Sequence, residues 1–253
     1  MSIGNKVYRA QCVDDSMVWA KENLATAPDG AVFLADELTQ AKGRQGRVWA
    51  VHQDQLIVTF ILKPPQLAAV PPEDLPIRLN QLNMAIVLGI LDPLKKYGAT
   101  LKWPNDFIIN HKKVGGMLMH LVWQGTLPIG IIVGFAINVN NEFDPADPLF
   151  SIATSLKTVT GSVVDRRTLY KSMLATLNAW YVQWQHGQYM HIYKHWKIEQ
   201  AYLGSKIQVH QKDGSLVVGV AQQVMPNGDL MLRDEHNKQR TISFFQVEEV
   251  LVA

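Results

Sequence analysis

Three apolar segments in the middle of the chain, residues 106–110, 114–123 and 129–139, are separated by connections of only a few residues. Apolar segments of this length, bounded by turn residues, are typical of strands. Strands joined by such short connections pair antiparallel, because a parallel pair needs a much longer crossover. The centre of the chain therefore predicts an antiparallel sheet.

Further strands and helices are predicted around this sheet. Asp14, Asp15 and Ser16 offer capping side chains for a helix running to about residue 24. A second amphipathic helix is predicted over residues 168–184. The other predicted strands are residues 6–12, 31–38 and 55–62.

The longest predicted helix covers residues 76–97. Its apolar residues recur at helical spacing, and Gly98 supplies a stop. The apolar set is Leu79, Leu82, Ile86 and Ile90, and the polar residues expected on the exposed face are Arg78, Asn83 and Lys96.

The last fifty residues are predicted to form short strands and no helices. Asp213-Gly214 and Asn227-Gly228 mark two tight hairpins, because both pairs tolerate the positive φ values of such turns. We place the boundary near Leu203, which predicts a larger domain over residues 1–202 and a small all-β domain over residues 203–253.

Composition restricts the class of protein. A formal net charge of +2 over 253 residues is too small to indicate nucleic-acid or membrane binding. Cys12 is the only cysteine, so intramolecular disulfides and cysteine-rich zinc sites are excluded, and its apolar neighbours favour a packed thiol. His120 and His195 lack the spacing of a metal site, and no metal ligands are predicted.

The sequence contains no apolar run of about 18 residues, and its N-terminus has no apolar signal core. A soluble, cytoplasmic protein is therefore expected.

Residues 42–47, followed by Trp49, combine Lys42, Arg44 and Arg47 with two glycines between predicted strands. Glycines let backbone amides approach a ligand, and arginine matches pairs of carboxylate or phosphate oxygens. The segment is interpreted as an anion-binding loop. A solvated basic turn is an equal alternative on this pattern alone.

Two later segments also carry candidate ligand-binding residues. Lys102-Trp103-Pro104-Asn105-Asp106 leads into Lys113-Val114-Gly115-Gly116, where Lys102 could meet a ligand and the paired glycines permit close approach. Taken alone, an ordinary strand, turn and strand with Trp103 in the core is favoured. Asn138 and Asn140 end a further strand, where asparagine can orient a phosphate but more often turns the chain.

In sequence order these segments resemble the biotin–protein ligase family. The matching stretches are DELTQAKGRQGRVW, KWPND with KKVGG, GFAINVN and Ala153-Thr154-Ser155-Leu156. The resemblance spans the chain and implies an α+β fold, with a mixed, largely antiparallel sheet packed by helices and a small C-terminal β-barrel. It implies the class of ligase without an N-terminal DNA-binding domain, because the first predicted strand begins within about ten residues of Met1.

The resemblance also implies a reaction in two steps. The biotin carboxylate attacks the α-phosphate of magnesium-bound ATP, and a lysine on a biotin carrier domain of a carboxylase, of the acetyl-CoA carboxylase type, attacks the biotinyl-adenylate. Such catalysis depends on positioning and on charge neutralisation. Magnesium is expected to be held mostly by phosphate oxygens and water.

Residue roles are implied in the same way. Lys102 and Arg44 are the expected catalytic residues. Biotin is expected to contact Ser16, Leu38, Lys42, Gly43, Arg44, Lys102, Gly115 and Gly116, and the nucleotide is expected to contact Arg47, Trp49 and Asn138.

This sequence differs from the family pattern at several positions whose family residues contact the ligand. Val18 replaces asparagine, Leu38 glutamine, Ala41 and Lys42 a glycine–arginine pair, Gln45 an arginine, His120 a glutamate and Ala136 a glycine. A net hydrogen bond contributes about 0.5–1.5 kcal/mol, so these changes predict altered biotin contacts in a working ligase.

Two alternatives stay open. Leu38 suits the aliphatic tail of lipoate or octanoate, which favours a ligase or transferase for another acyl cofactor. The lost polar contacts also fit a non-catalytic homologue that only binds ligand or carrier protein. A homodimer is possible, because an exposed strand edge can pair with another subunit.

Overall fold

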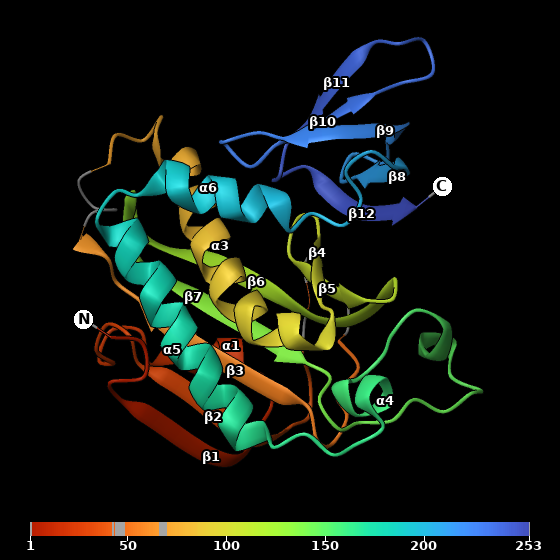
Figure 1. Ribbon diagram of the computed structural model, residues 1–253. Coiled ribbons are helices and arrows are strands. Elements are labelled where there is room, and N and C mark those ends of the chain that lie inside the picture. Colours follow the sequence, from red (N-terminus) through yellow and green to blue (C-terminus); the bar gives the residue numbers. More distant parts are fainter. Residues whose placement is uncertain (1, 42, 44–48, 66–69, 253) are drawn as a thin grey trace.

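The computed structural model describes residues 2–41, 43, 49–65 and 70–252 (Figure 1). Seven strands form the larger sheet in the order β1-β2-β3-β7-β6-β5-β4. Only β1 and β2 pair parallel, and the remaining neighbours pair antiparallel. The strands are β1 (Val7–Val13), β2 (Val32–Leu38), β3 (Leu56–Leu62), β4 (Thr100–Lys102), β5 (Asp106–Ile109), β6 (Lys112–Gln124) and β7 (Leu127–Ile137). The predicted mixed, largely antiparallel sheet is confirmed.

Helices cover both faces of this sheet (Figure 1). Helix α1 packs on one face, where Phe33, Ile61 and Ile132 point, and Asp15 caps its start by accepting hydrogen bonds from the amides of Met17 and Val18. The other face lies against α3 and α5. The helices are α1 (Ser16–Glu22), α3 (Leu75–Leu91), α4 (Leu156–Thr160), α5 (Arg166–Gln185) and α6 (Tyr189–Ile198), with 3-10 turns η2 (Asp92–Tyr97) and η3 (Pro148–Ser151).

The long predicted helix is confirmed as α3 followed by η2, and Gly98 ends it in the left-handed conformation at φ 80°. The prediction that Asn83 lies on an exposed face is wrong, because its side chain is only 1% exposed. Helix α3 is enclosed by the sheet, by α5 and by α6, so that even polar positions of its middle turns are buried.

Five antiparallel strands form the C-terminal sheet in the order β11-β10-β9-β8-β12. They are β8 (Lys206–Gln211), β9 (Leu216–Val224), β10 (Leu230–Arg233), β11 (Gln239–Ile242) and β12 (Val247–Val252). The two predicted hairpins are confirmed, with Gly214 at φ 83° and Gly228 at φ 91°. We propose that the small barrel-like unit begins at residue 203, because α6 ends at Ile198 and β8 begins at Lys206.

The two sheets share one hydrophobic core. Ile207, Val224 and Val250 of the C-terminal sheet belong to the same cluster of buried residues as Trp103 and Phe107 of the larger unit. Burial of apolar surface therefore stabilises the contact between the two units, at roughly 25 cal/mol per Å² removed from water.

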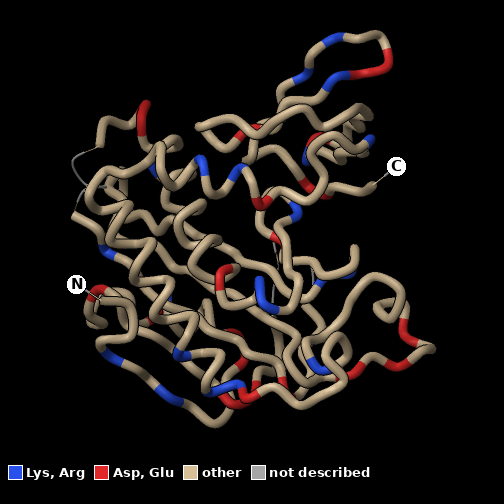
Figure 2. The backbone as a smooth tube through the Cα atoms, viewed as in Figure 1, with Lys and Arg blue, Asp and Glu red and all other residues tan. Residues whose placement is uncertain are grey.

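The predicted packing of Cys12 is wrong, because its thiol is exposed. Cys12 lies on β1, the edge strand of the larger sheet, and none of the residues of β1 is buried. Basic and acidic residues are interspersed along the backbone (Figure 2). No helix in the described part of the chain is long and apolar enough to cross a membrane.

Candidate functional site

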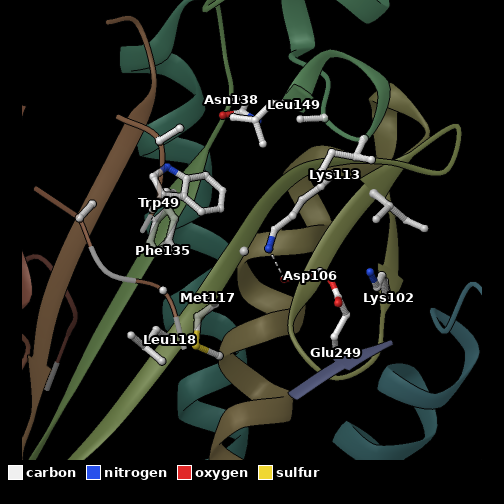
Figure 3. Close-up of a pocket in the computed structure, with 18 of the residues that line it drawn as sticks. Trp49, Lys102, Asp106, Lys113, Met117, Leu118, Phe135, Asn138, Leu149 and Glu249 are labelled. Atoms are coloured by element: carbon white, nitrogen blue, oxygen red, sulfur yellow. Dashed lines mark ion pairs between the residues drawn. The ribbon is translucent and has the colours of Figure 1, made fainter. Parts of the chain in front are cut away.

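A cavity of about 670 Å³ opens between the larger sheet and strand β12 of the C-terminal sheet (Figure 3). Its floor is set by strand register. Ile57, Ala136, Gly116 and Asp106 stand opposite one another on β3, β7, β6 and β5, and Lys102 of β4 pairs with Asp106. The next row contains Thr59, Gly134 and Leu118. Small side chains in the middle of both rows leave room for a ligand.

Charged side chains gather at the β5 end of the cavity. Lys113 Nζ lies 2.7 Å from Asp106 Oδ1, and both side chains are partly exposed to the cavity. The same ammonium lies 5.3 Å from the centre of the Trp49 ring, within the range of a cation–π contact. Lys102 and Glu249 face this region from β4 and β12 (Figure 3). The two ammonium groups can offer positive charge to a carboxylate or phosphate, and Asp106 and Glu249 offset part of that charge.

Lys113 was not assigned a role from the sequence. The signal was present, because it precedes the glycine pair and follows Asp106 across a short β5–β6 connection. Gly116 leaves room for the ion pair. A Cβ at this position would lie 3.1 Å from Asp106 Oδ1 and 3.4 Å from Lys113 Cε.

The opposite end of the cavity is mostly apolar. Ser16 Oγ and Thr59 Oγ1 form a buried hydrogen bond of 2.8 Å, and Leu38 lines the cavity beside them with 9% of its surface exposed. Two hydroxyls that share one hydrogen keep one further donor and several acceptor positions. Val18 is 49% exposed and lies outside the cavity lining, and His120 is also exposed.

The two glycines of the predicted biotin slot differ in place. Gly116 lines the cavity, whereas Gly115 lies outside its lining. A Cβ at Gly115 would lie 2.6 Å from both the carbonyl oxygen of Ala136 and Cδ1 of Ile137. Gly115 thus permits close packing of β6 on β7.

The third group of side chains surrounds Asn138. Its Oδ1 accepts a hydrogen bond of 2.9 Å from Gln55 Nε2, and its Nδ2 donates one of 3.0 Å to the carbonyl of Thr154. Asn138 therefore joins β7 to the segment after η3 while lining the cavity. Trp49 Nε1 is buried without a hydrogen-bond partner in the described part of the chain, which fits a ligand that offers an acceptor there.

Within the basic loop of residues 42–47, the structure describes Gly43. Ala41, Gly43 and Trp49 line the cavity. Lys42, Arg44, Gln45 and Arg47 lie outside the described residues.

Carboxylates are present for a magnesium–phosphate complex but do not form a metal cage. Asp106, Glu248 and Glu249 line the cavity, and within the described ranges no three His, Cys, Asp or Glu side chains come together to hold an ion. This donor set fits a magnesium ion that is bound mainly through phosphate oxygens and water.

The family follows from sequence comparison. A model of the Biotin/lipoate A/B protein ligase family matches residues 9–138, and the chain belongs to this family. It is 28% identical over 219 residues to the Bifunctional ligase/repressor BirA of Bacillus spizizenii, covering 86% of this chain but 66% of that protein, just under two thirds. It is also 28% identical over 211 residues to the Biotin–[acetyl-CoA-carboxylase] ligase of Mycobacterium tuberculosis. That match covers 81% of this chain and 73% of that protein.

The fold is also that of known ligases. The structure of the Biotin protein ligase from Aquifex aeolicus in complex with biotin and ATP superimposes with a TM-score of 0.83, at 23% identity, over 98% of this chain and 100% of that chain. The predicted family and fold class are therefore confirmed.

Proposed function

We propose that the chain is an ATP-dependent biotin ligase that acts on the lysine of a biotin carrier domain, as in a carboxylase of the acetyl-CoA carboxylase type. The observation that carries this proposal is the slot floored by Gly134, Ala136 and Gly116, which leads from the Ser16–Thr59 hydroxyls to the Lys113–Asp106 pair. The slot suits a long acid whose carboxylate lies at the charged end.

In the first step a biotin carboxylate oxygen forms a bond to the α-phosphorus of ATP, and pyrophosphate leaves with the bonding electrons. Lys113 and Lys102, which line the charged end of the cavity, would stabilise the negative charge that develops there. Preorganised charges of this kind are often a large part of catalysis. Magnesium would supply further charge neutralisation through the phosphates.

In the second step the neutral amine of the carrier lysine attacks the acyl carbon, AMP leaves and a proton is released. No nucleophile from the ligase is required, so its residues bind and orient the reactants. Holding two reactants in line can lower a barrier by roughly 7–11 kcal/mol.

The individual roles form part of the proposal. Ser16, Leu38 and Gly116 would contact biotin, with Lys42, Gly43 and Arg44 from the basic loop. Arg47, Trp49 and Asn138 would contact the nucleotide. Gly115 would not contact biotin itself. It would keep the slot in shape, since it allows β6 to pack closely on β7.

Pyrophosphate exchange into ATP tests the first step. The purified chain is incubated with magnesium, ATP and labelled pyrophosphate, and with biotin, lipoate, octanoate or no acid. Exchange that depends on biotin supports the proposal. In a separate assay with labelled biotin, the biotinyl group must then pass to a carrier domain with an intact lysine but not to its Lys→Arg variant. Absence of exchange with every acid would overturn it in favour of a binding protein.

A second candidate is a ligase for an aliphatic acid. The nearly buried Leu38 beside the slot favours it, because this side chain offers no hydrogen bond to a ureido ring. Exchange with octanoate or lipoate at the expense of biotin would identify this function.

A further inference from the structure

A tight turn of the C-terminal sheet is attached directly to the segment that carries Lys102 and Asp106. Trp103 Nε1 donates a buried hydrogen bond of 2.9 Å to the carbonyl oxygen of Gly228. Beside it, Asn80 Nδ2 of α3 donates to the carbonyl oxygen of Asn227. Trp103 and Asn80 are buried, so both bonds lie in the contact between the two units.

The turn at residues 225–229 is braced internally. Gly228 adopts φ 91°, and its amide donates a hydrogen bond of 2.9 Å to the carbonyl oxygen of Met225. The amide of Met225 in turn donates one of 2.7 Å to the carbonyl oxygen of Asp229. A Cβ at Gly228 would lie 3.0 Å from Asn80 Cγ. The close approach requires glycine, and the turn has little freedom to move on α3.

The other side of the attachment is equally fixed. Asn105 Oδ1 accepts a hydrogen bond of 2.9 Å from Asn83 Nδ2, and its backbone carbonyl accepts one of 3.1 Å from the amide of Met117. Lys102 and Asp106 therefore flank three residues that α3, β6 and the turn hold in place.

The turn continues into strands that lead to the opposite wall of the cavity. It ends β9, which pairs with β8, and β8 pairs with β12. Residues 247–252 of β12 line the cavity facing Lys102 and Asp106. A shift of the turn would thus change the separation between the two walls.

We infer that the 225–229 turn is a positioning element of the active site, and that Trp103 and Gly228 act through Lys102 and Asp106. This inference rests on the proposed ligase function, because the reaction supplies its main readout. The rate of a reaction depends strongly on the positions of the groups at the reacting centre, since a misplacement of about 1 Å can lower it about a hundredfold.

The test compares two single-bond deletions. Trp103→Phe removes the N–H that reaches Gly228 and keeps an aromatic ring. Tyr193→Phe is the matched control, because Tyr193 OH donates a bond of 2.9 Å to Val224 O and so joins α6 to the same β9, away from residues 102–106. Both variants are measured by biotin-dependent pyrophosphate exchange and by thermal unfolding.

The expected result is a fall in kcat of at least about tenfold for Trp103→Phe, with KM for biotin within about threefold, and a change below about twofold for Tyr193→Phe. Asn80→Ala should lower kcat in the same direction. Equal losses in Trp103→Phe and Tyr193→Phe, or an unchanged kcat in Trp103→Phe, would overturn the inference.

Hydrogen–deuterium exchange separates this inference from the proposed function. In Trp103→Phe the backbone amides of residues 101–106 other than Pro104, which has no amide hydrogen, should exchange faster than in the unsubstituted chain, and in Tyr193→Phe they should not. If the unsubstituted chain activates no acid, the ligase proposal fails, and this local exchange still decides the coupling. Unchanged protection at residues 101–106 would refute it.

Discussion

The two ends of the cavity are built differently. At the charged end, Lys113 and Asp106 come from neighbouring strands and keep a partly exposed ion pair. At the apolar end, Ser16 and Thr59 share a buried hydrogen bond beside Leu38. Exposed ion pairs contribute little to folding, whereas buried hydroxyls are costly to leave unpaired. The charged end is therefore free to serve the reaction, and the apolar end combines ligand selection with stability.

The largest effect is expected at the charged end. Lys113→Met should lower kcat for pyrophosphate exchange by about 10²–10³-fold, because one preorganised charge is lost from the reacting centre. Lys112→Met is the control, since Lys112 Nζ donates to the carbonyl of Phe150 and lies outside the cavity lining. Similar losses in both variants would show that Lys113 has no special role.

The glycine pair separates activity from folding. Gly115→Ala places a Cβ 2.6 Å from Ala136 O, and overpacking of this kind should lower the free energy of unfolding by about 1–3 kcal/mol. Gly116→Ala meets the movable ends of Asp106 and Lys113, so it should keep the stability and lower exchange by about tenfold. Urea unfolding and exchange kinetics measure both. A reversal of the two phenotypes contradicts this assignment.

The hydrogen bond between the Ser16 and Thr59 hydroxyls should contribute to the free energy of unfolding. Ser16→Ala or Thr59→Val leaves the other buried hydroxyl without its partner, at a cost of about 1–3 kcal/mol in the free energy of unfolding. The double variant should cost less than the sum of the two, because the remaining unpaired group is then removed. Strict additivity in urea unfolding would argue against a shared hydrogen bond.

The smallest effect concerns ligand selection. Leu38→Gln should tighten biotin by about threefold to tenfold through one added hydrogen bond and weaken octanoate, as measured by calorimetric titration. Val18→Asn should leave both affinities unchanged, because Val18 is exposed outside the cavity lining. Tighter octanoate binding in Leu38→Gln would favour a different orientation of the acid.

Much of the fold was predictable from local pattern. The β5–β6–β7 strands, the capped helix α1 and the glycine turns at 214 and 228 each depend on residues near in sequence. The prediction for Asn83 failed because its burial depends on what packs around α3. The prediction that Cys12 is packed was wrong as well. Its apolar neighbours in the sequence do not show that β1 lies at the edge of the sheet, where its side chains are less covered.

The candidate site was predictable as a set of segments but not as a geometry. Ser16, Leu38, Gly43, Trp49, Lys102, Gly116 and Asn138 all line one cavity. Lys113 lies in one of the matching segments but was given no role, because its ion pair with Asp106 depends on the register of β5 on β6.

The amino-acid pattern alone was enough to identify the family, the central strands, the long helix and the segments that could bind an anion. Tertiary structure alone decided that Gly115 packs a strand while Gly116 opens a slot, and that Trp103 holds a turn 125 residues away. The physical reason is that hydrogen bonds and packing join atoms that are close in space, whereas periodicity and turn chemistry report only on residues close along the chain.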